Sequence, residues 1–102
     1  MIEITDANFA EIVDAKDITV IDFFAEWCGP CKMLTPVIEN IAKNNNDITV
    51  GKIDIDANRT ITNQYGIRSV PTIVFMKNGI LADKLVGVKS IHEIQAKIDS
   101  LK

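Results

Sequence analysis

The segment from residue 18 to residue 25 constrains the fold of this chain more than any other. It reads Ile-Thr-Val-Ile-Asp-Phe-Phe-Ala, an almost continuous run rich in β-branched and aromatic residues. A strand with this pattern is covered on both faces, because an apolar side chain on either side needs a buried surface to pack against. We therefore expect a central strand here, with further structure above and below it.

Helix and strand patterns alternate along the first two thirds of the chain. A short strand at 2–4 precedes a helix capped by Thr5 or Asp6, and a longer helix starts after Pro30 and ends in the polar run 44–47. A strand at 48–55 then leads to a short helix capped by Asn58 that stops at Gly66. The apolar positions of the three helices are Phe9, Ile12 and Val13; then Leu34, Val37, Ile38 and Ile41; then Ile61 and Tyr65.

The last third of the sequence predicts a hairpin and a closing helix. Strands at 72–76 and 80–86 flank Asn78-Gly79, a dipeptide that favours the positive φ angles of a two-residue turn. Ser90 and Glu93 form a capping box before a helix striped by Ile91, Ile94, Ile98 and Leu101. Early βα units and a late hairpin predict an α/β fold with a mixed sheet and helices on both faces, in one domain spanning residues 1–102.

Composition and charge exclude several classes of protein. The chain has 102 residues, 47% of them hydrophobic, and a formal net charge of −3. No apolar run approaches the roughly 18 residues of a membrane span, and no basic stripe is present to bind phosphate groups. We therefore expect neither a membrane nor a nucleic acid as partner. Since the N-terminal residues lack the pattern of a secretory signal, we expect a reducing, cytoplasmic location.

Both cysteines fall in the string Trp27-Cys28-Gly29-Pro30-Cys31, between the apolar strand and the longest helix. Two cysteines placed at random in a chain of this length are three apart only about 2% of the time. At a helix N-terminus the free N–H groups and the helix dipole favour an anion, which here is a thiolate. Thiols in such positions have pKa values lowered from about 8.5 to roughly 3.5–7.5, so the pair can supply a nucleophile near neutral pH.

The order of the two cysteines predicts their roles. Cys28, outermost at the turn, is expected to attack, and Cys31, one helical turn further in, to resolve the mixed disulfide that results. One alternative is a pair of buried, inert thiols. Another is a zinc site, but zinc needs four ligands and only His92, expected to face solvent on the last helix, offers a further nitrogen. We expect no metal.

Four strings carry a resemblance to a known family: residues 22–32 (DFFAEWCGPCK), 65–72 (YGIRSVPT), 77–79 (KNG) and 86–87 (VG). In this order and spacing the chain resembles the thioredoxin family over essentially its whole length. The resemblance implies the thioredoxin fold, a central five-stranded mixed sheet flanked by four helices in three α/β/α layers. It also implies a protein-disulfide reductase that serves cell redox homeostasis and donates electrons to reductive enzymes. The redox-active disulfide would be re-reduced by a flavin-dependent thioredoxin reductase that uses NADPH, with no cofactor bound to this chain.

Asp22 lies inside the apolar strand, where desolvation should raise the pKa of its carboxyl group. The resemblance implies that Asp22 is the general base or proton relay for Cys31, with Lys52 as the neighbour that modulates it. The alternatives are an aspartate exposed at an edge and, for Lys52, a solvated strand residue.

The resemblance also implies a docking surface around the cysteines. An X-Pro bond is usually trans, so the sequence alone predicts a trans bond before Pro71, whereas the family implies a cis bond. Val70 would pair its backbone with a substrate chain, as an added strand does. Trp27 could be plain core, but a large apolar residue before a reactive turn fits a docking face better. The expected uncharged patch consists of Trp27, Gly29, Pro30, Val70, Pro71, Gly87 and Val88.

Two positions depart from the common family pattern: Phe24 replaces a tryptophan and Ser69 replaces a glycine. We expect a monomer that reduces disulfides in many client proteins. The competing hypotheses are an oxidase or isomerase of the same fold, a thioredoxin devoted to one client, and a non-catalytic binding module. Gly29-Pro30 argues against the oxidase, since oxidising relatives typically have a histidine between the cysteines.

Overall fold

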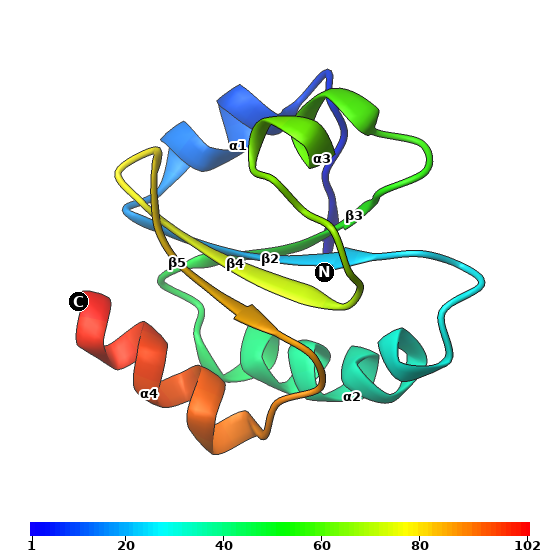
Figure 1. The fold of residues 1–102 in the computed structure, drawn as a ribbon. Helices are drawn as coiled ribbons and strands as arrows, with labels where there is room; N and C mark the ends of the chain where they lie inside the picture. The colour runs from blue at the N-terminus through cyan, green and yellow to red at the C-terminus, as the bar shows by residue number, and fades with distance from the viewer.

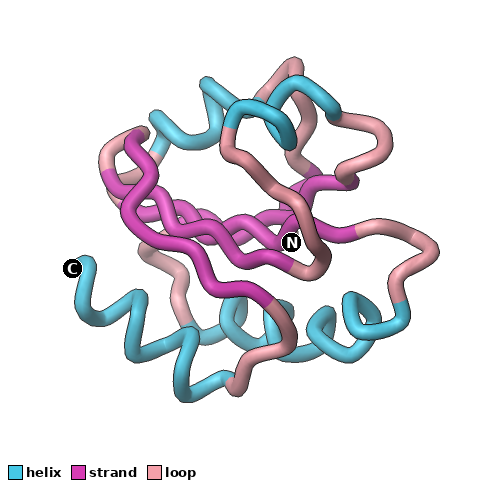
Figure 2. Tube along the Cα trace, viewed as in Figure 1, coloured by secondary structure: helices cyan, strands magenta, loops and turns pink.

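A five-stranded mixed sheet forms the middle layer of the computed structural model, which describes residues 1–102 (Figures 1 and 2). The strands lie side by side in the order β1-β3-β2-β4-β5, so the apolar strand β2 is central, as predicted. Their bounds are β1 Ile2–Glu3, β2 Ile18–Phe24, β3 Thr49–Asp54, β4 Thr72–Lys77 and β5 Ile80–Val86.

Strand direction divides the sheet into two parts. β1 and β2 both run parallel to β3, whereas β4 runs antiparallel to β2 and β5 antiparallel to β4. The β4–β5 turn has positive φ angles at Asn78 (53°) and Gly79 (78°), which confirms the predicted hairpin. In the parallel part Asp22 is directly opposite Lys52.

Two helices cover each face of the sheet (Figure 1). α1 (Phe9–Ala15) and α3 (Arg59–Gln64) lie on one side, and α2 (Gly29–Asn44) and α4 (Ile91–Leu101) on the other. This is the predicted three-layer α/β/α arrangement with four helices. None of the four helices combines the length and the apolar character needed to span a bilayer.

Side chains alternate across the sheet and build two separate cores. On β2, Val20 packs with the α2 and α4 side chains, while Ile21 packs with those of α1 and α3. Asp22 is the next even-numbered residue and therefore faces the α2 layer. The core on the α2 side consists of Ile18, Val20, Leu34, Ile38, Ile41, Ile48, Val50, Ile73, Phe75, Ile94 and Ile98. The core on the α1 side consists of Ile4, Phe9, Val13, Ile21, Phe23, Ile53, Ile61, Val74 and Met76.

The capping of two helices differs from the sequence predictions. Asn8, rather than Thr5 or Asp6, occupies the N-cap position of α1, because Thr5 and Asn8 bond each other in the preceding turn. Asn58 does occupy the N-cap position of α3, but its side chain makes no capping bond there. Asp6 accepts the free N–H groups of α3 instead. The predicted cap at Ser90 is confirmed, since its hydroxyl accepts the N–H of Glu93 at 3.1 Å.

Candidate active site at the start of helix α2

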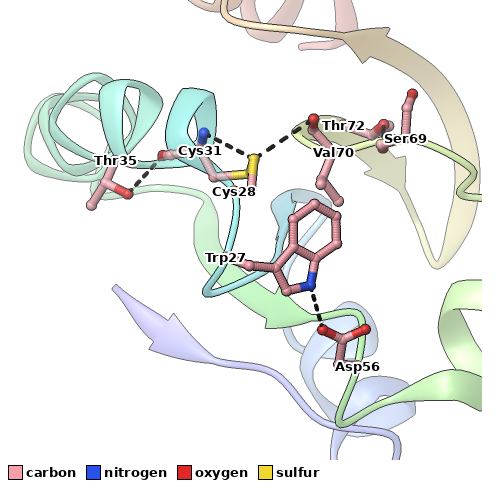
Figure 3. The surroundings of a disulfide bond; sticks show 8 residues. All are labelled: Trp27, Cys28, Cys31, Thr35, Asp56, Ser69, Val70 and Thr72. Carbon is pink, nitrogen blue, oxygen red and sulfur yellow. Dashed lines mark hydrogen bonds between the residues drawn. A yellow bond between two sulfur atoms is a disulfide. The ribbon is translucent and has the colours of Figure 1, made fainter.

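The cysteine pair is positioned by the start of α2. Cys28 is the N-cap residue, and its Sγ accepts the backbone N–H of Cys31 at 3.2 Å (Figure 3). The two sulfur atoms form a disulfide bond, and Pro30 lies in the first turn, where no N–H is needed. Cys28 is 4% exposed and Cys31 3% exposed, so both cysteines are nearly buried and exposure alone does not distinguish Cys28 from Cys31.

A second segment, distant in sequence, approaches Cys28. The carbonyl oxygen of Val70 lies 3.8 Å from Cys28 Sγ, and the Val70-Pro71 peptide bond is cis. The trans bond predicted from general statistics is therefore wrong, and the family expectation is right. The intrinsic preference for trans is only about 0.5–1 kcal/mol, which tertiary packing readily outweighs.

Hydrogen bonds on both sides of Pro71 hold this loop in place. Thr72 Oγ1 donates to the Ser69 carbonyl at 2.7 Å (Figure 3), and the Gly87 N–H donates to the Pro71 carbonyl at 2.9 Å. Gly87 has a φ of 95°, a backbone conformation that favours glycine. The fold thus brings the loop between α3 and β4 and the end of β5 to the cysteine pair.

Trp27 is 70% exposed, so the interpretation of this residue as plain core is wrong. Its indole Nε1–H donates to Asp56 Oδ2 at 2.8 Å (Figure 3), and the Asp56 N–H donates in turn to Asp54 Oδ1 at 2.9 Å. The ring is thereby fixed beside the cysteines. No local sequence pattern pointed to Asp56 in this role, because the two partners are 29 residues apart and Asp56 belongs to no motif.

Asp22 is 2% exposed, which rules out the edge-exposed alternative. Its Oδ1 atom is buried without a hydrogen-bond partner. Desolvation raises the pKa of Asp22 from 3.8 to about 6, and the positive charge of Lys52 offsets part of this effect. A carboxyl group with this pKa can take up or release a proton near neutral pH.

Lys52 is half-buried on the neighbouring strand. Its Nζ lies 5.6 Å from the centroid of the Phe24 ring, a cation–π distance, and no ion pair within 4 Å joins it to Asp22. The lysine therefore acts on Asp22 through the field of its charge and not through a direct bond.

The remaining residues of the expected patch lie at the surface or beside it. Gly29 has no other atoms within 4 Å of where a Cβ would be, Pro30 is exposed, and Val88 is 43% exposed directly after Gly87. A hollow of about 370 Å³, which the sequence did not predict, reaches Cys31 from the side. Its walls are Phe24, Ala25, Glu26, Cys31, Lys32 and Thr35.

No group of three or more His, Cys, Asp and Glu side chains comes together in the structure in a way that could hold a metal ion. His92 is exposed on α4, as expected. The zinc alternative therefore has no ligand set.

Together the fold and the site define a dithiol–disulfide oxidoreductase with the thioredoxin fold. The thioredoxin family model matches residues 1–100. A thioredoxin of Chlorobaculum thiosulfatiphilum is 44% identical over 99 residues, which cover 95% of this chain and 92% of the relative. A thioredoxin of Rickettsia felis is 48% identical over 93 residues, 89% of each chain.

Solved structures give the same result. A mutant thioredoxin from Halobacterium salinarum superimposes with a TM-score of 0.93 at 34% identity, covering 98% of this chain and 88% of that one. The chain belongs to the thioredoxin family, and its redox-active Cys28–Cys31 pair is that of a protein-disulfide reductase.

Proposed function

We propose that residues 1–102 act as a single-domain, monomeric, cytoplasmic reductant of disulfides in many client proteins. The observation that carries the proposal is the position of the Cys28–Cys31 disulfide: it spans the first turn of α2, beside an exposed docking surface. Each residue role proposed below has its own supporting observation.

In the first step the Cys28 thiolate of the reduced protein attacks one sulfur of a client disulfide. A bond forms between Cys28 Sγ and that sulfur, and the other client sulfur leaves as a thiolate that takes up a proton. The N-cap position supports the role of Cys28, because the free N–H groups of α2, including that of Cys31, stabilise negative charge on its sulfur.

In the second step Cys31 resolves the mixed disulfide. Asp22 accepts the proton of the Cys31 thiol, and the resulting thiolate attacks Cys28 Sγ and releases the second client thiolate. The raised pKa of Asp22, together with its place on the sheet face that α2 covers, supports this assignment. The charge of Lys52 keeps enough of the carboxyl group ionised near neutral pH to act as a base.

Each cycle leaves the protein oxidised and consumes two electrons. We propose that a flavin-dependent thioredoxin reductase returns both electrons and one proton from NADPH, while the second proton comes from solvent. The chain itself needs no bound cofactor for either step, because both bonds that form and break are between sulfur atoms.

Client chains dock in extended conformation against Val70. The backbone of this half-buried residue can pair with a client segment as an edge strand does. Because the Val70 carbonyl oxygen lies 3.8 Å from Cys28 Sγ, such a segment would run beside the attacking sulfur atom. The surrounding docking surface consists of Trp27, Gly29, Pro30, Gly87 and Val88, together with Pro71, which is itself buried. Its uncharged character suits clients of varied sequence.

The assignment of roles predicts the behaviour of two single variants. In Cys31→Ser the second step is lost, so mixed disulfides with client proteins accumulate, while Cys28→Ser forms few adducts because the nucleophile is missing. Non-reducing gels and mass spectrometry of a lysate exposed to each reduced variant would measure this. Equal accumulation in both variants would show that the roles are misassigned.

Two further measurements separate the competing functions. A redox potential below about −260 mV, the lower end of the extracted glutathione range, would support a reductase, whereas an oxidase or isomerase would have a clearly higher value. Equilibration with glutathione followed by alkylation and mass analysis gives this potential. A non-catalytic binding module would keep its function when both cysteines are replaced by serine, whereas a reductase would lose it.

A further inference from the structure

A small hollow lies beside the docking surface, between the loop after α3 and strand β5. Its volume is about 120 Å³. The residues that line it are Gly66, Ile67, Arg68, Ser69, Thr72, Lys84 and Val86. Two of these residues carry a positive charge and none carries a negative charge.

Arg68 is exposed and has no partner in the molecule. It takes part in none of the three ion pairs, and its guanidinium makes no hydrogen bond. A guanidinium with five free N–H donors is suited to a carboxylate, which it can bind through two parallel hydrogen bonds.

Lys84 supplies the second charge. Its Nζ donates to the Tyr65 carbonyl at 3.1 Å, which anchors the ammonium group at the end of α3 and leaves two of its protons free. The neighbouring Asp83 does not neutralise it, because Asp83 points to the other face of β5 and pairs there with Lys97 on α4 at 2.6 Å.

Two residues that line the hollow belong to the segment that approaches Cys28. Arg68 and Ser69 directly precede Val70, whose carbonyl oxygen lies 3.8 Å from Cys28 Sγ. Two residues of extended chain span about 7 Å. A client segment paired with Val70 therefore passes the hollow within one or two residues of its target cysteine.

The opposite flank of the docking surface has the opposite charge. Asp56 lies on the Trp27 side, held by the indole N–H, whereas Ser69 lies on the Val70 side (Figure 3). Ser69 is one of the residues that line the hollow. Asp54 and the exposed Glu26 add to the negative charge near Trp27. Charge across the site therefore favours one orientation of a charged client segment over the other.

We propose that the Arg68–Lys84 hollow binds the carboxylate of an Asp or Glu side chain one or two residues from the target cysteine of an extended client segment. The proposal rests on the function proposed above, since it needs a client paired with Val70. It makes this chain a reductase with a preference for disulfides flanked by acidic residues.

Two sets of three peptide disulfides test the preference. They are symmetric dimers joined through a single cysteine, with Asp, Asn or Lys at the two positions before the cysteine in one set and at the two positions after it in the other, because only one side of the client cysteine meets the hollow. The reduced protein is mixed with each dimer, and alkylation followed by mass analysis gives the rate of its oxidation. Exposed ion pairs have small effects, so in the set that meets the hollow we expect the Asp dimer to react about two- to fivefold faster than the Asn dimer, and the Lys dimer to react slowest. The preference should shrink at about 0.5 M salt, where exposed charges are screened.

Arg68→Gln should reduce the Asp-to-Asn rate ratio to near one, and Arg68→Lys should restore most of it. Arg59→Gln is the matched control, because Arg59 is the only other arginine, is also exposed, and does not line the hollow. A ratio unchanged in Arg68→Gln, or lowered equally in Arg59→Gln, would overturn the proposal. Failure of the wild-type protein to reduce even the Asn dimer would instead overturn the proposed function.

Discussion

The raised pKa of the single residue Asp22 comes from its place in the fold. The same carboxyl group has an ordinary pKa in the unfolded chain and a pKa of about 6 in the folded one, because β2 buries it between two helical layers. The folded protein therefore holds this proton more tightly than the unfolded chain does. As the pH rises from about 4 to above 6, the folded state loses stability relative to the unfolded state.

Asp22→Asn should therefore stabilise the protein in a pH-dependent way. The displacement of the pKa from 3.8 to about 6 corresponds to about 3 kcal/mol, the upper bound of the expected gain at pH 8, while little gain is expected at pH 4. Urea unfolding of the oxidised protein at both pH values measures this. Asp17→Asn, an exposed aspartate just before β2, should change stability by less than about 0.5 kcal/mol at either pH. An equal gain at pH 4 and pH 8 would contradict the argument.

The role of a residue can be predicted from the sequence when that role is determined by the residues next to it in the chain. The spacing of Cys28 and Cys31 and the aspartate within an apolar strand are local signals, and the structure places all three as expected. The bond from Trp27 to Asp56 depends on two segments meeting in space, so no local pattern could reveal it.

At the scale of elements, α3 is held by a residue from outside itself. Asp6 Oδ1 accepts the N–H of Ile61 at 2.9 Å, and Oδ2 accepts that of Thr60 at 3.3 Å. Asn58 Oδ1 in turn accepts the Asp6 N–H at 2.9 Å. Asp6 thus caps α3, and Asn58 binds Asp6 instead of capping α3. This explains why local capping rules predicted the right helices with the wrong capping side chains. The rules assume that a cap comes from the adjoining residues, whereas this cap crosses 55 residues of sequence.

Asp6→Ala should loosen α3 more than its exposed position suggests. Loss of a helix cap costs about 0.5–2 kcal/mol, and here two N–H groups lose their acceptor. We expect lower stability in urea and faster hydrogen exchange at the amides of Thr60 and Ile61. Asp6→Asn is the matched control, since it keeps one side-chain oxygen as an acceptor, and its effect should be smaller. Identical exchange at these amides in Asp6→Ala and the wild type would show that the cap does not hold the helix.

At the scale of the whole molecule, one sheet couples two cores that do not touch each other directly. Each of the strands β2, β3 and β4 contributes side chains to both cores, so loss of packing on one face disturbs strands that the other face needs. The Cα radius of gyration of 12.1 Å is close to the roughly 13 Å expected for a compact domain of about 100 residues. Both facts favour a single cooperative unfolding transition.

The substitution Ile98→Ala tests this coupling, because Ile98 is fully buried in the core on the α2 side, near the end of α4. Truncation of a buried isoleucine to alanine costs about 2–5 kcal/mol, and Ile98→Val should cost about 0.5–1.5 kcal/mol. Trp27, the only tryptophan, reports on the active site by fluorescence, while far-ultraviolet circular dichroism reports on all helices and strands. Because the sheet joins both cores to the site, we expect the two signals to shift to lower urea concentration by the same amount in each variant. A Trp27 transition that stayed at the wild-type midpoint while the dichroism moved would show that the site unfolds separately from the core beneath α4.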